Sequence, residues 1–276
     1  MDVTLKHIRD FYWSKRYSSG HQFDNGVWAN FIPYKKGYRG VNRYGCAGQH
    51  DEIQVIKIDK DYNVTDDKIV TGGEDPRAFT FKGHPYGLTW DPHTSATTGS
   101  WIFDYKIIDL VTGVITKLNI ENVPDPKVEI LGKNWIPLEK DNELFFVITI
   151  DPKPSILKCD LDNGECTWVT PYTEDLDITI SRGGTSLIYN ESKDIYFGLG
   201  HRTHNCHYHT AFLYTLTSDF KKSTVGPDLK VSREAGVTDP LSIYQKENKF
   251  YSCMAHSPIQ LGDTTEATSA LYEIIL

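Results

Sequence analysis

Short apolar runs along the chain alternate with breaks rich in glycine, asparagine, aspartate and proline, and helical periodicity is scarce. Segment 53–58 (IQVIKI) alternates apolar and polar residues, as a half-buried strand does. Segment 144–150 (LFFVITI) is continuously apolar, which is typical of a strand covered on both faces. The best helix candidate is the weak pattern at 3–13. Further strands are predicted at 78–81, 86–90, 101–110, 114–120, 156–161, 165–169, 185–190, 195–199, 211–217, 241–245, 249–254 and 269–275. This succession of strands and turns predicts an all-β sandwich, barrel or propeller.

Polar or glycine-rich motifs recur along the 276 residues, and each precedes a set of predicted strands. They lie at 39–43, 73–77, 132–135, 181–184 and 237–240. Their uneven spacing is close to the roughly 50 residues that a four-stranded propeller blade occupies. The sequence therefore predicts an all-β fold, a five-bladed β-propeller, as one domain over residues 1–276. Because the innermost strands of a propeller line its central channel, we expect these motifs to converge on one funnel.

The motifs carry charged and amide side chains that are costly to bury without partners. These candidates are Arg43, Glu74, Asp75, Arg77, Lys133, Asn134 and Arg182. Gathered around a funnel, they would form a site for a polyhydroxylated or anionic ligand. The sharpest string is GGEDPR at 72–77, whose two adjacent carboxylates are expected to face opposite ways on a strand. A loop with an ordinary ion pair is an equally good interpretation of this string taken alone.

The second motif places a cation, an amide and an aromatic ring side by side in Lys133, Asn134 and Trp135, which are groups that bind a sugar or a phosphate. A strand edge with a buried tryptophan is the commoner alternative. In the string SRGG at 181–184, the glycines would allow a ligand to approach the backbone closely, although a plain turn explains them equally well.

Histidines gather in the string HRTHNCHYH at 201–209. Their spacing matches no common zinc signature, and four ligands in one short loop would be awkward geometrically. Hydrogen bonding to substrate by His201 or His204 is therefore favoured over metal binding. His256 begins a similar loop near the end of the chain, and the other histidines are interpreted as surface residues. We expect neither a metal nor a cofactor.

Charge and cysteine content narrow the class of protein. The chain has 29 Lys and Arg against 37 Asp and Glu, a net charge of -8, which argues against nucleic-acid and anionic membrane partners. The absence of a long apolar stretch predicts a cytoplasmic protein.

Five cysteines without a CxxC pair predict free thiols. A two-residue turn at Asn163-Gly164 would place Cys159 opposite Trp168 and diagonal to Cys166.

In this combination the motifs resemble glycoside hydrolase family 130 and its relatives, which include β-mannoside phosphorylases, hydrolases and β-1,2-mannosyltransferases. The string 73–77 resembles the family's G-x-E-D-P-R motif closely, and looser similarity extends over most of the chain, including the segments that contain His201, Tyr208 and His256. The resemblance implies a five-bladed propeller and inverting chemistry. It implies that Asp75 is the general acid, or the base toward an acceptor in synthesis. It also implies that Arg77 holds Asp75 or the sugar, and that Arg43 holds the sugar.

One departure from the family affects the predicted activity. Phosphorylases carry a His-Arg-Pro type string whose arginine binds phosphate, whereas this chain has 149–152 (TIDP), and an aspartate there would repel phosphate. We therefore predict an inverting glycosyltransferase whose partners are a sugar donor, either a nucleotide sugar or a sugar 1-phosphate, and a glycan acceptor. The alternatives are an inverting phosphorylase or hydrolase of β-mannosides, and a non-catalytic glycan-binding propeller.

Overall fold

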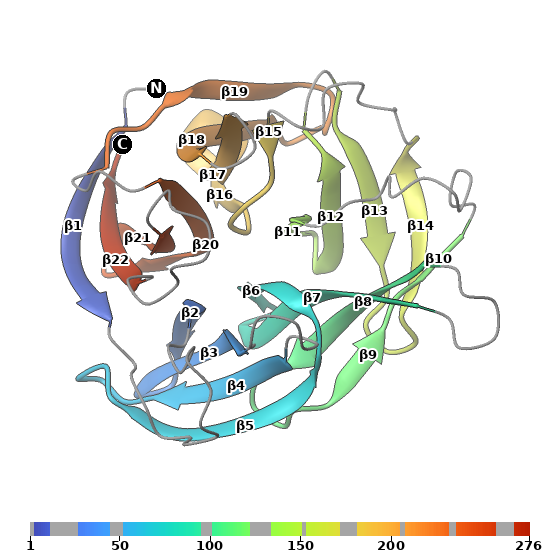
Figure 1. Cartoon of the computed structure of the whole chain (residues 1–276). Helices are drawn as coiled ribbons and strands as arrows, with labels where there is room; N and C mark the ends of the chain where they lie inside the picture. Colours follow the sequence, from blue (N-terminus) through green and yellow to red (C-terminus); the bar gives the residue numbers. More distant parts are fainter. Residues whose placement is uncertain are drawn as a thin grey trace.

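Five sheets surround a central axis in the computed structural model of the chain, as the blades of a propeller do (Figure 1). The predicted five-bladed β-propeller is therefore confirmed. The structure describes residues 3–11, 27–44, 52–94, 101–121, 134–150, 153–171, 181–204, 208–231, 236–257 and 268–276. None of the helices within these ranges has the length and apolar character needed to cross a membrane.

The first three blades follow one another along the chain. Blade 1 contains β2 (Val27–Tyr34), β3 (Gly37–Tyr44), β4 (Glu52–Ile58) and β5 (Val64–Gly72). Blade 2 contains β6 (Glu74–Phe81), β7 (His84–Thr94), β8 (Trp101–Asp109) and β9 (Ile115–Lys117). Blade 3 contains β11 (Ile136–Lys140), β12 (Glu143–Thr149), β13 (Ser155–Cys159), β14 (Glu165–Thr170) and, added in parallel at its outer edge, β10 (Asn119–Ile120). Strand β10 ties the chain leaving blade 2 to the rim of blade 3.

The last two blades depart from the plain four-strand succession. Blade 4 contains β15 (Ser181–Arg182), β16 (Ile188–Asn190), β17 (Ile195–His204), β18 (Tyr208–Thr217) and β19 (Ser223–Asp228), with a 3-10 turn at Glu191–Lys193. Its inner edge is split, because β15 and β16 both pair with β17. Blade 5 contains β20 (Val237–Lys246), β21 (Lys249–Ser257), β22 (Thr268–Ile275) and β1 (Thr4–Phe11).

Strand β1 closes the ring, because it comes from the start of the chain and pairs with β22 near its end. The helix predicted at 3–13 is wrong, since backbone pairing with β22 over Thr4–Phe11 outweighs a weak local preference. Phe11 then packs edge-to-face on Phe31 of blade 1, with ring centroids 5.3 Å apart. Phe11 therefore adds to the packing that joins the last blade to the first, in which Tyr244 of β20 also meets Phe31.

Apolar side chains fill the spaces between neighbouring blades rather than the axis. Trp135, which precedes β11, stacks on Tyr105 of β8 with ring centroids 3.8 Å apart and an interplanar angle of 17°. Phe79 of β6 meets Phe146 of β12 edge-to-face in the same cluster. Aromatic packing of this kind holds blades 2 and 3 together.

Four of the predicted blade motifs lie where a blade begins, and the first does not. Segments 73–77, 181–184 and 237–240 open or precede the inner strands β6, β15 and β20, and the described part of 132–135 precedes β11. Segment 39–43 instead lies on β3, the second strand of blade 1, whose inner strand is β2. Arg43 therefore reaches the axis from a neighbouring strand.

The cysteine prediction requires a correction. Cys159 and Cys166 are direct cross-strand partners and form a disulfide, whereas Cys253 is a buried free thiol. The turn between β13 and β14 is longer than the predicted two residues, because the N–H of Asp160 donates to the carbonyl of Glu165 and the N–H of Gly164 donates to the carbonyl of Asp160. The register consequently moves by two residues, and Trp168 faces Leu157 instead of Cys159.

We expect closure of the ring to depend on Phe11. The Phe11→Ala variant should lose about 3–5 kcal/mol of unfolding free energy, because it removes the ring that fills the blade 5–blade 1 contact. Ile8→Ala on the same strand is the matched control, since Ile8 is 41% exposed, and it should cost less than about 1 kcal/mol. Chemical denaturation followed by circular dichroism measures both. Equal losses in the two variants would contradict this account of closure.

Candidate functional site

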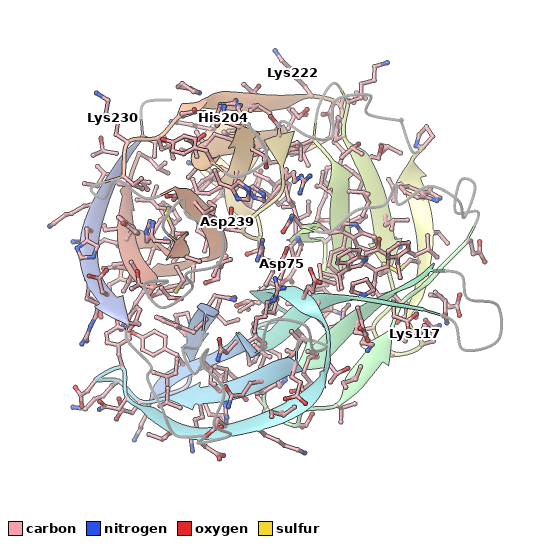
Figure 2. The ribbon with its side chains drawn as sticks, viewed as in Figure 1. Asp75, Lys117, His204, Lys222, Lys230 and Asp239 are labelled. Atoms are coloured by element: carbon pink, nitrogen blue, oxygen red, sulfur yellow. A yellow bond between two sulfur atoms is a disulfide. The ribbon has the colours of Figure 1, made fainter. Side chains whose placement is uncertain are left out.

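Polar side chains from all five blades meet at one end of the central channel, which we call the polar end. The inner strands run in the same sense around the axis, so their first residues lie together. Asp75 comes from blade 2, Asn134 from blade 3, Arg182 from blade 4 and Asp239 from blade 5, while Arg43 comes from β3 of blade 1. In Figure 2, Asp75 and Asp239 lie close to the axis.

The GGEDPR string forms a β-bulge at the start of β6. Pairing with β7 jumps from Glu74 to Arg77, so the register of the two strands skips Asp75 and the following proline. Asp75 adopts a left-handed backbone with φ 47°, which aspartate tolerates better than most residues. Gly73 is required beside it, because its φ is 153° and a Cβ would meet Thr89 Oγ1 at 2.5 Å. A bulge re-aims side chains, and here it directs Asp75.

Arg43 holds both acidic residues of the bulge. Its Nη1 donates to Asp75 Oδ1 at 2.8 Å, and its Nη2 lies 3.8 Å from Glu74 Oε2. The expectation that the two carboxylates face opposite ways is therefore wrong, because the bulge breaks the alternation of the strand. The Asp75 side chain keeps 12% of its surface exposed. Arg43 therefore holds the Asp75 carboxylate in place while part of it stays accessible to a ligand.

Arg77 lies buried directly behind Asp75. Its Nη2 donates to Asn134 Oδ1 at 2.5 Å, and its Nη1 lies 3.3 Å from the carbonyl oxygens of Asp75 and Pro76. Burial lowers the pKa of Arg77, and the negative charges of Asp75 and Asp239 oppose that shift. Asn134 has a φ of 74°, so Asp75 and Asn134, which both accept hydrogen bonds from Arg77, have left-handed backbone. Such strain persists where surrounding contacts enforce it.

Two residues that the sequence analysis did not select complete the polar end, namely Asp239 and His209. Nδ1 of His209 donates to Asp239 Oδ1 at 2.7 Å, across the blade 4–blade 5 junction. His201 stacks on His209 with ring centroids 4.9 Å apart. Asp239-Pro240 repeats Asp75-Pro76 at the start of an inner strand. That repeat was the sequence signal that would have identified Asp239.

Burial and charge set the protonation of this cluster. Burial lowers the pKa of His201 to about 4, against the opposing effect of Asp239, so its ring is neutral near pH 7. Burial alone would raise the pKa of Asp239, but His201, His209 and Arg77 together lower it. The cluster therefore contains an ionised carboxylate beside a neutral imidazole.

Trp135 and His256 are both buried, and their predicted role in substrate binding stays a prediction. Trp135 is 1% exposed and stacked on Tyr105 in the core. His256 is buried in blade 5, with Thr238 Oγ1 at 3.2 Å from Nδ1 and Tyr272 Oη at 3.0 Å from Nε2. Both side chains therefore support the blades.

His204 and Tyr208 lie away from the Asp239 cluster. His204 Nε2 lies 3.0 Å from Thr210 Oγ1 and 3.3 Å from Asp228 Oδ2 of the outer strand β19. Tyr208 is exposed beside His204, with ring centroids 5.7 Å apart. His204 lies three positions after His201, so strand alternation puts the two side chains on opposite faces. Figure 2 places His204 further from the axis than Asp239. Lys133 lies outside the described residues.

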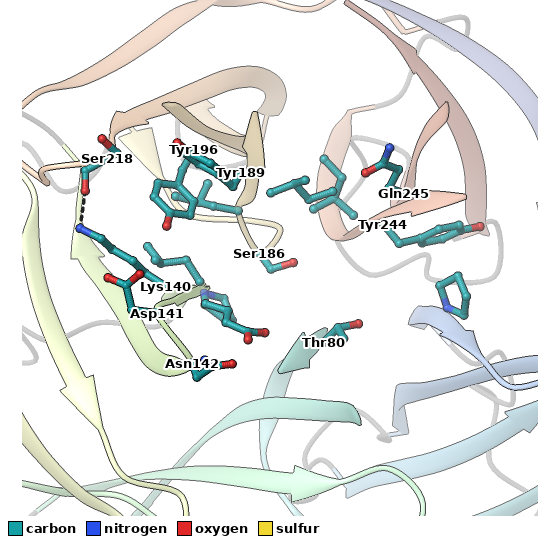
Figure 3. A pocket seen from close by; sticks show the side chains of 17 residues that line it. Thr80, Lys140, Asp141, Asn142, Ser186, Tyr189, Tyr196, Ser218, Tyr244 and Gln245 are labelled. Atoms are coloured by element: carbon teal, nitrogen blue, oxygen red, sulfur yellow. Dashed lines mark hydrogen bonds between the residues drawn. The ribbon is translucent and has the colours of Figure 1, made fainter. Parts of the chain in front are cut away.

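A cavity of about 730 Å³ lies at the opposite end of the channel (Figure 3). Its walls come from the last residues of the inner strands, among them Thr80, Lys140 and Gln245. Lys140 donates to the carbonyl oxygen of Ser218 at 2.7 Å, which ties blade 3 to blade 4. Despite its size, we do not place the chemistry here, because the buried charged and titratable side chains of Arg77, His201 and Asp239 gather at the polar end.

The comparisons with known proteins bear on the fold. No protein-family model matches the sequence, and no curated protein matches it significantly. Solved structures do match: the catalytic domain of a glycoside hydrolase family 62 α-L-arabinofuranosidase from Coprinopsis cinerea aligns with a TM-score of 0.67 and 10% identity, covering 99% of this chain and 97% of that chain.

Two further structures belong to glycoside hydrolase family 43. A β-1,3-galactosidase with galactodeoxynojirimycin has a TM-score of 0.59 and 11% identity, covering 95% of this chain and 93% of that one. An enzyme from Xanthomonas citri complexed with xylose has a TM-score of 0.58 and 13% identity, covering 90% and 86%. These similarities establish the shared propeller fold. The resemblance to family 130 stays a prediction.

We expect the acceptor that Asn134 offers to Arg77 to stabilise the site measurably. Asn134→Gly keeps the left-handed backbone free of strain but leaves a buried guanidinium without that partner. Asn142→Gly is the matched control, because Asn142 is exposed and has a φ of 62°. The first variant should lose about 1.5–3 kcal/mol more unfolding free energy than the second. Denaturant titration of both variants measures the difference, and similar values would show that the contact contributes little.

Proposed function

We propose that the protein is a carbohydrate-active enzyme that cleaves glycosidic bonds at the polar end of the channel. The observation that carries this proposal is Asp75, a reachable carboxylate on a strained bulge, held at 2.8 Å by Arg43 and backed by the buried Arg77. The fold of the compared glycoside hydrolases supports the proposal, although fold alone does not determine function. The closeness of GEDPR to the family 130 motif adds to it.

Each group at the polar end has a role in this proposal. Asp75 acts on the reacting bond as one member of a pair, because inverting hydrolysis uses two carboxyl groups, a base that takes a proton from water and an acid that protonates the leaving oxygen. Arg43 fixes the carboxylate and stabilises its charged form, which favours the base role. Glu74 is the second carboxylate beside Arg43. The guanidinium of Arg77 is too deeply buried to contact a sugar freely, so it positions the bulge.

The comparisons favour the hydrolase or phosphorylase alternative over the glycosyltransferase preferred from sequence. The three structures described above are glycoside hydrolases, and none is described with a nucleotide sugar. The string 149–152, on which the transferase preference rested, lies partly outside the described residues. A glycan as substrate stays part of the proposal, and a nucleotide-sugar donor does not. β-Mannosides are proposed first, from the motif resemblance alone.

The predicted cytoplasmic location stays a prediction. The Cys159–Cys166 disulfide weighs against it, because disulfides persist mainly in oxidising compartments.

A panel of aryl glycosides tests the activity. Wild-type protein would be incubated with β-mannoside, β-xyloside, β-galactoside and α-L-arabinofuranoside substrates, with and without inorganic phosphate. We expect release of the aryl group from at least one substrate. Asp75→Asn should lower kcat by about 100-fold or more, because loss of a positioned acid or base costs about 10²–10⁴-fold. Dependence on phosphate would identify a phosphorylase.

The matched control is Asp219→Asn, an aspartate that caps an exposed turn of blade 4 far from the axis. It should leave kcat unchanged. Full activity in Asp75→Asn would contradict the assignment of the site. Inactivity across the panel together with glycan binding that is unaffected by Asp75→Asn would favour the non-catalytic binding propeller. Turnover of nucleotide sugars alone would restore the glycosyltransferase.

A further inference from the structure

His201, His209 and Asp239 form a compact cluster of potential metal ligands at the blade 4–blade 5 junction. One ligand atom from each lies within 4.8 Å of the others. His201 and Asp239 are buried, and His209 is half-buried, which leaves a route for an ion. The two histidines, which belong to one hairpin of blade 4, would not by themselves indicate a metal site. The carboxylate of Asp239, from blade 5, supplies a third potential ligand.

An unpartnered buried nitrogen points into this cluster. Nδ1 of His201 is buried without a hydrogen-bond partner among the described residues, and it lies 3.8 Å from Asp239 Oδ1. Leaving a buried polar atom unsatisfied is costly and calls for an explanation. An imidazole nitrogen without a proton is a common metal ligand, so an ion beside Asp239 would satisfy it.

The scaffold holds the three side chains in place without an ion. In the hairpin formed by β17 and β18, His201 pairs with Ala211 and His209 with Thr203, so both histidines occupy the same face. The backbone N–H of His209 donates to the carbonyl of Gly236 at 2.9 Å, which fixes the hairpin against the start of β20. Asp239 follows three residues later. A site built on strands of this kind is largely preformed.

We propose that His201, His209 and Asp239 bind one divalent transition-metal ion of the zinc class. Two imidazole nitrogens and one carboxylate oxygen form a ligand set that suits zinc, and a water molecule would complete four-coordination. Calcium and magnesium fit less well, because they favour sites built mainly from oxygen ligands. The sequence analysis expected no metal because it considered ligands from one loop only.

The observed distances lie around those that this assignment requires, so small side-chain shifts would bring the ligands into place. Tetrahedral zinc with bonds of about 2.0–2.2 Å separates its ligand atoms by roughly 3.3 Å. The two histidine nitrogens lie 2.7 and 3.8 Å from the same oxygen of Asp239, on either side of that separation. The ion would replace the proton that His209 now shares with Asp239, and that proton is released on binding.

Two nearby cations limit how tightly the ion is held. Arg77 and Arg182 both act electrostatically on His201, and their charges oppose a second positive centre. The ionised Asp239 carboxylate offsets this repulsion in part. The proposal does not rest on glycosidase activity, because it concerns ligand geometry alone.

Titration of metal-free protein with Zn²⁺ tests the proposal without any carbohydrate substrate. Isothermal titration calorimetry should show one Zn²⁺ per chain, and Co²⁺ should give the visible absorption of a four-coordinate nitrogen and oxygen site. Asp239→Asn and His209→Gln should each weaken Zn²⁺ binding by at least about 100-fold, since even the loss of an outer contact costs about 10–100-fold. His209→Gln decides the matter if Asp239→Asn does not fold, as judged by circular dichroism.

The matched control is His84→Gln. His84 lies half-exposed in blade 2 with Nε2 3.1 Å from Asp109 Oδ1, so it is another histidine–aspartate pair, but one with no third potential ligand among the described residues. This variant should bind Zn²⁺ as the wild type does. The proposal is overturned if the wild type takes up no stoichiometric Zn²⁺, or if His209→Gln binds it as tightly as the wild type. If the protein hydrolyses none of the aryl glycosides, the zinc titrations still test this proposal, because they involve no carbohydrate.

Discussion

The buried guanidinium of Arg77 is the constraint on which the polar end depends. A permanently charged group inside a protein must have its donors satisfied and its charge balanced. Asn134 of blade 3 supplies an acceptor, the carbonyls of Asp75 and Pro76 supply others, and the field of Asp239 comes from blade 5. Three blades must therefore be in register before both Nη groups of Arg77 have acceptors and its charge is balanced, while its buried Nε has no hydrogen-bond partner among the described residues. The same register aligns the residues that face the channel.

Closure of the ring and the geometry of the site are consequently linked. Apolar contacts between blades, such as Trp135 on Tyr105, determine how far apart neighbouring blades lie. Polar contacts at the axis, such as Asn30 Nδ2 donating to the carbonyl of Pro76, then fix the bulge that carries Asp75. A change in blade packing would shift Asp75 relative to Arg43. Stability and chemistry are thus coupled through the inner strands.

The sequence allowed the blades to be predicted, because alternation, turns and repeated motifs are local features. It predicted which segments meet at the axis, and it included Arg43, Asp75, Arg77 and Asn134 among the site residues. It did not reveal the bulge that turns Glu74 and Asp75 toward one arginine, since a bulge depends on pairing with β7. The strand at Thr4–Phe11 was missed for a similar reason: its partner is about 260 residues away in sequence.

The residues missed at the blade 4–blade 5 junction show where such prediction stops. Successive side chains of a strand point to opposite faces, so the face that a histidine occupies depends on its position in the strand. That position is set by the register with the neighbouring strand. His201 and His209 share a face, whereas His204 contacts Asp228 on the outer strand. A cluster of histidines in the sequence therefore divides into two groups with different partners. Among the described histidines of this segment, the group facing Asp239 gains a third potential ligand from another blade, and that long-range contact is what makes it chemically distinct.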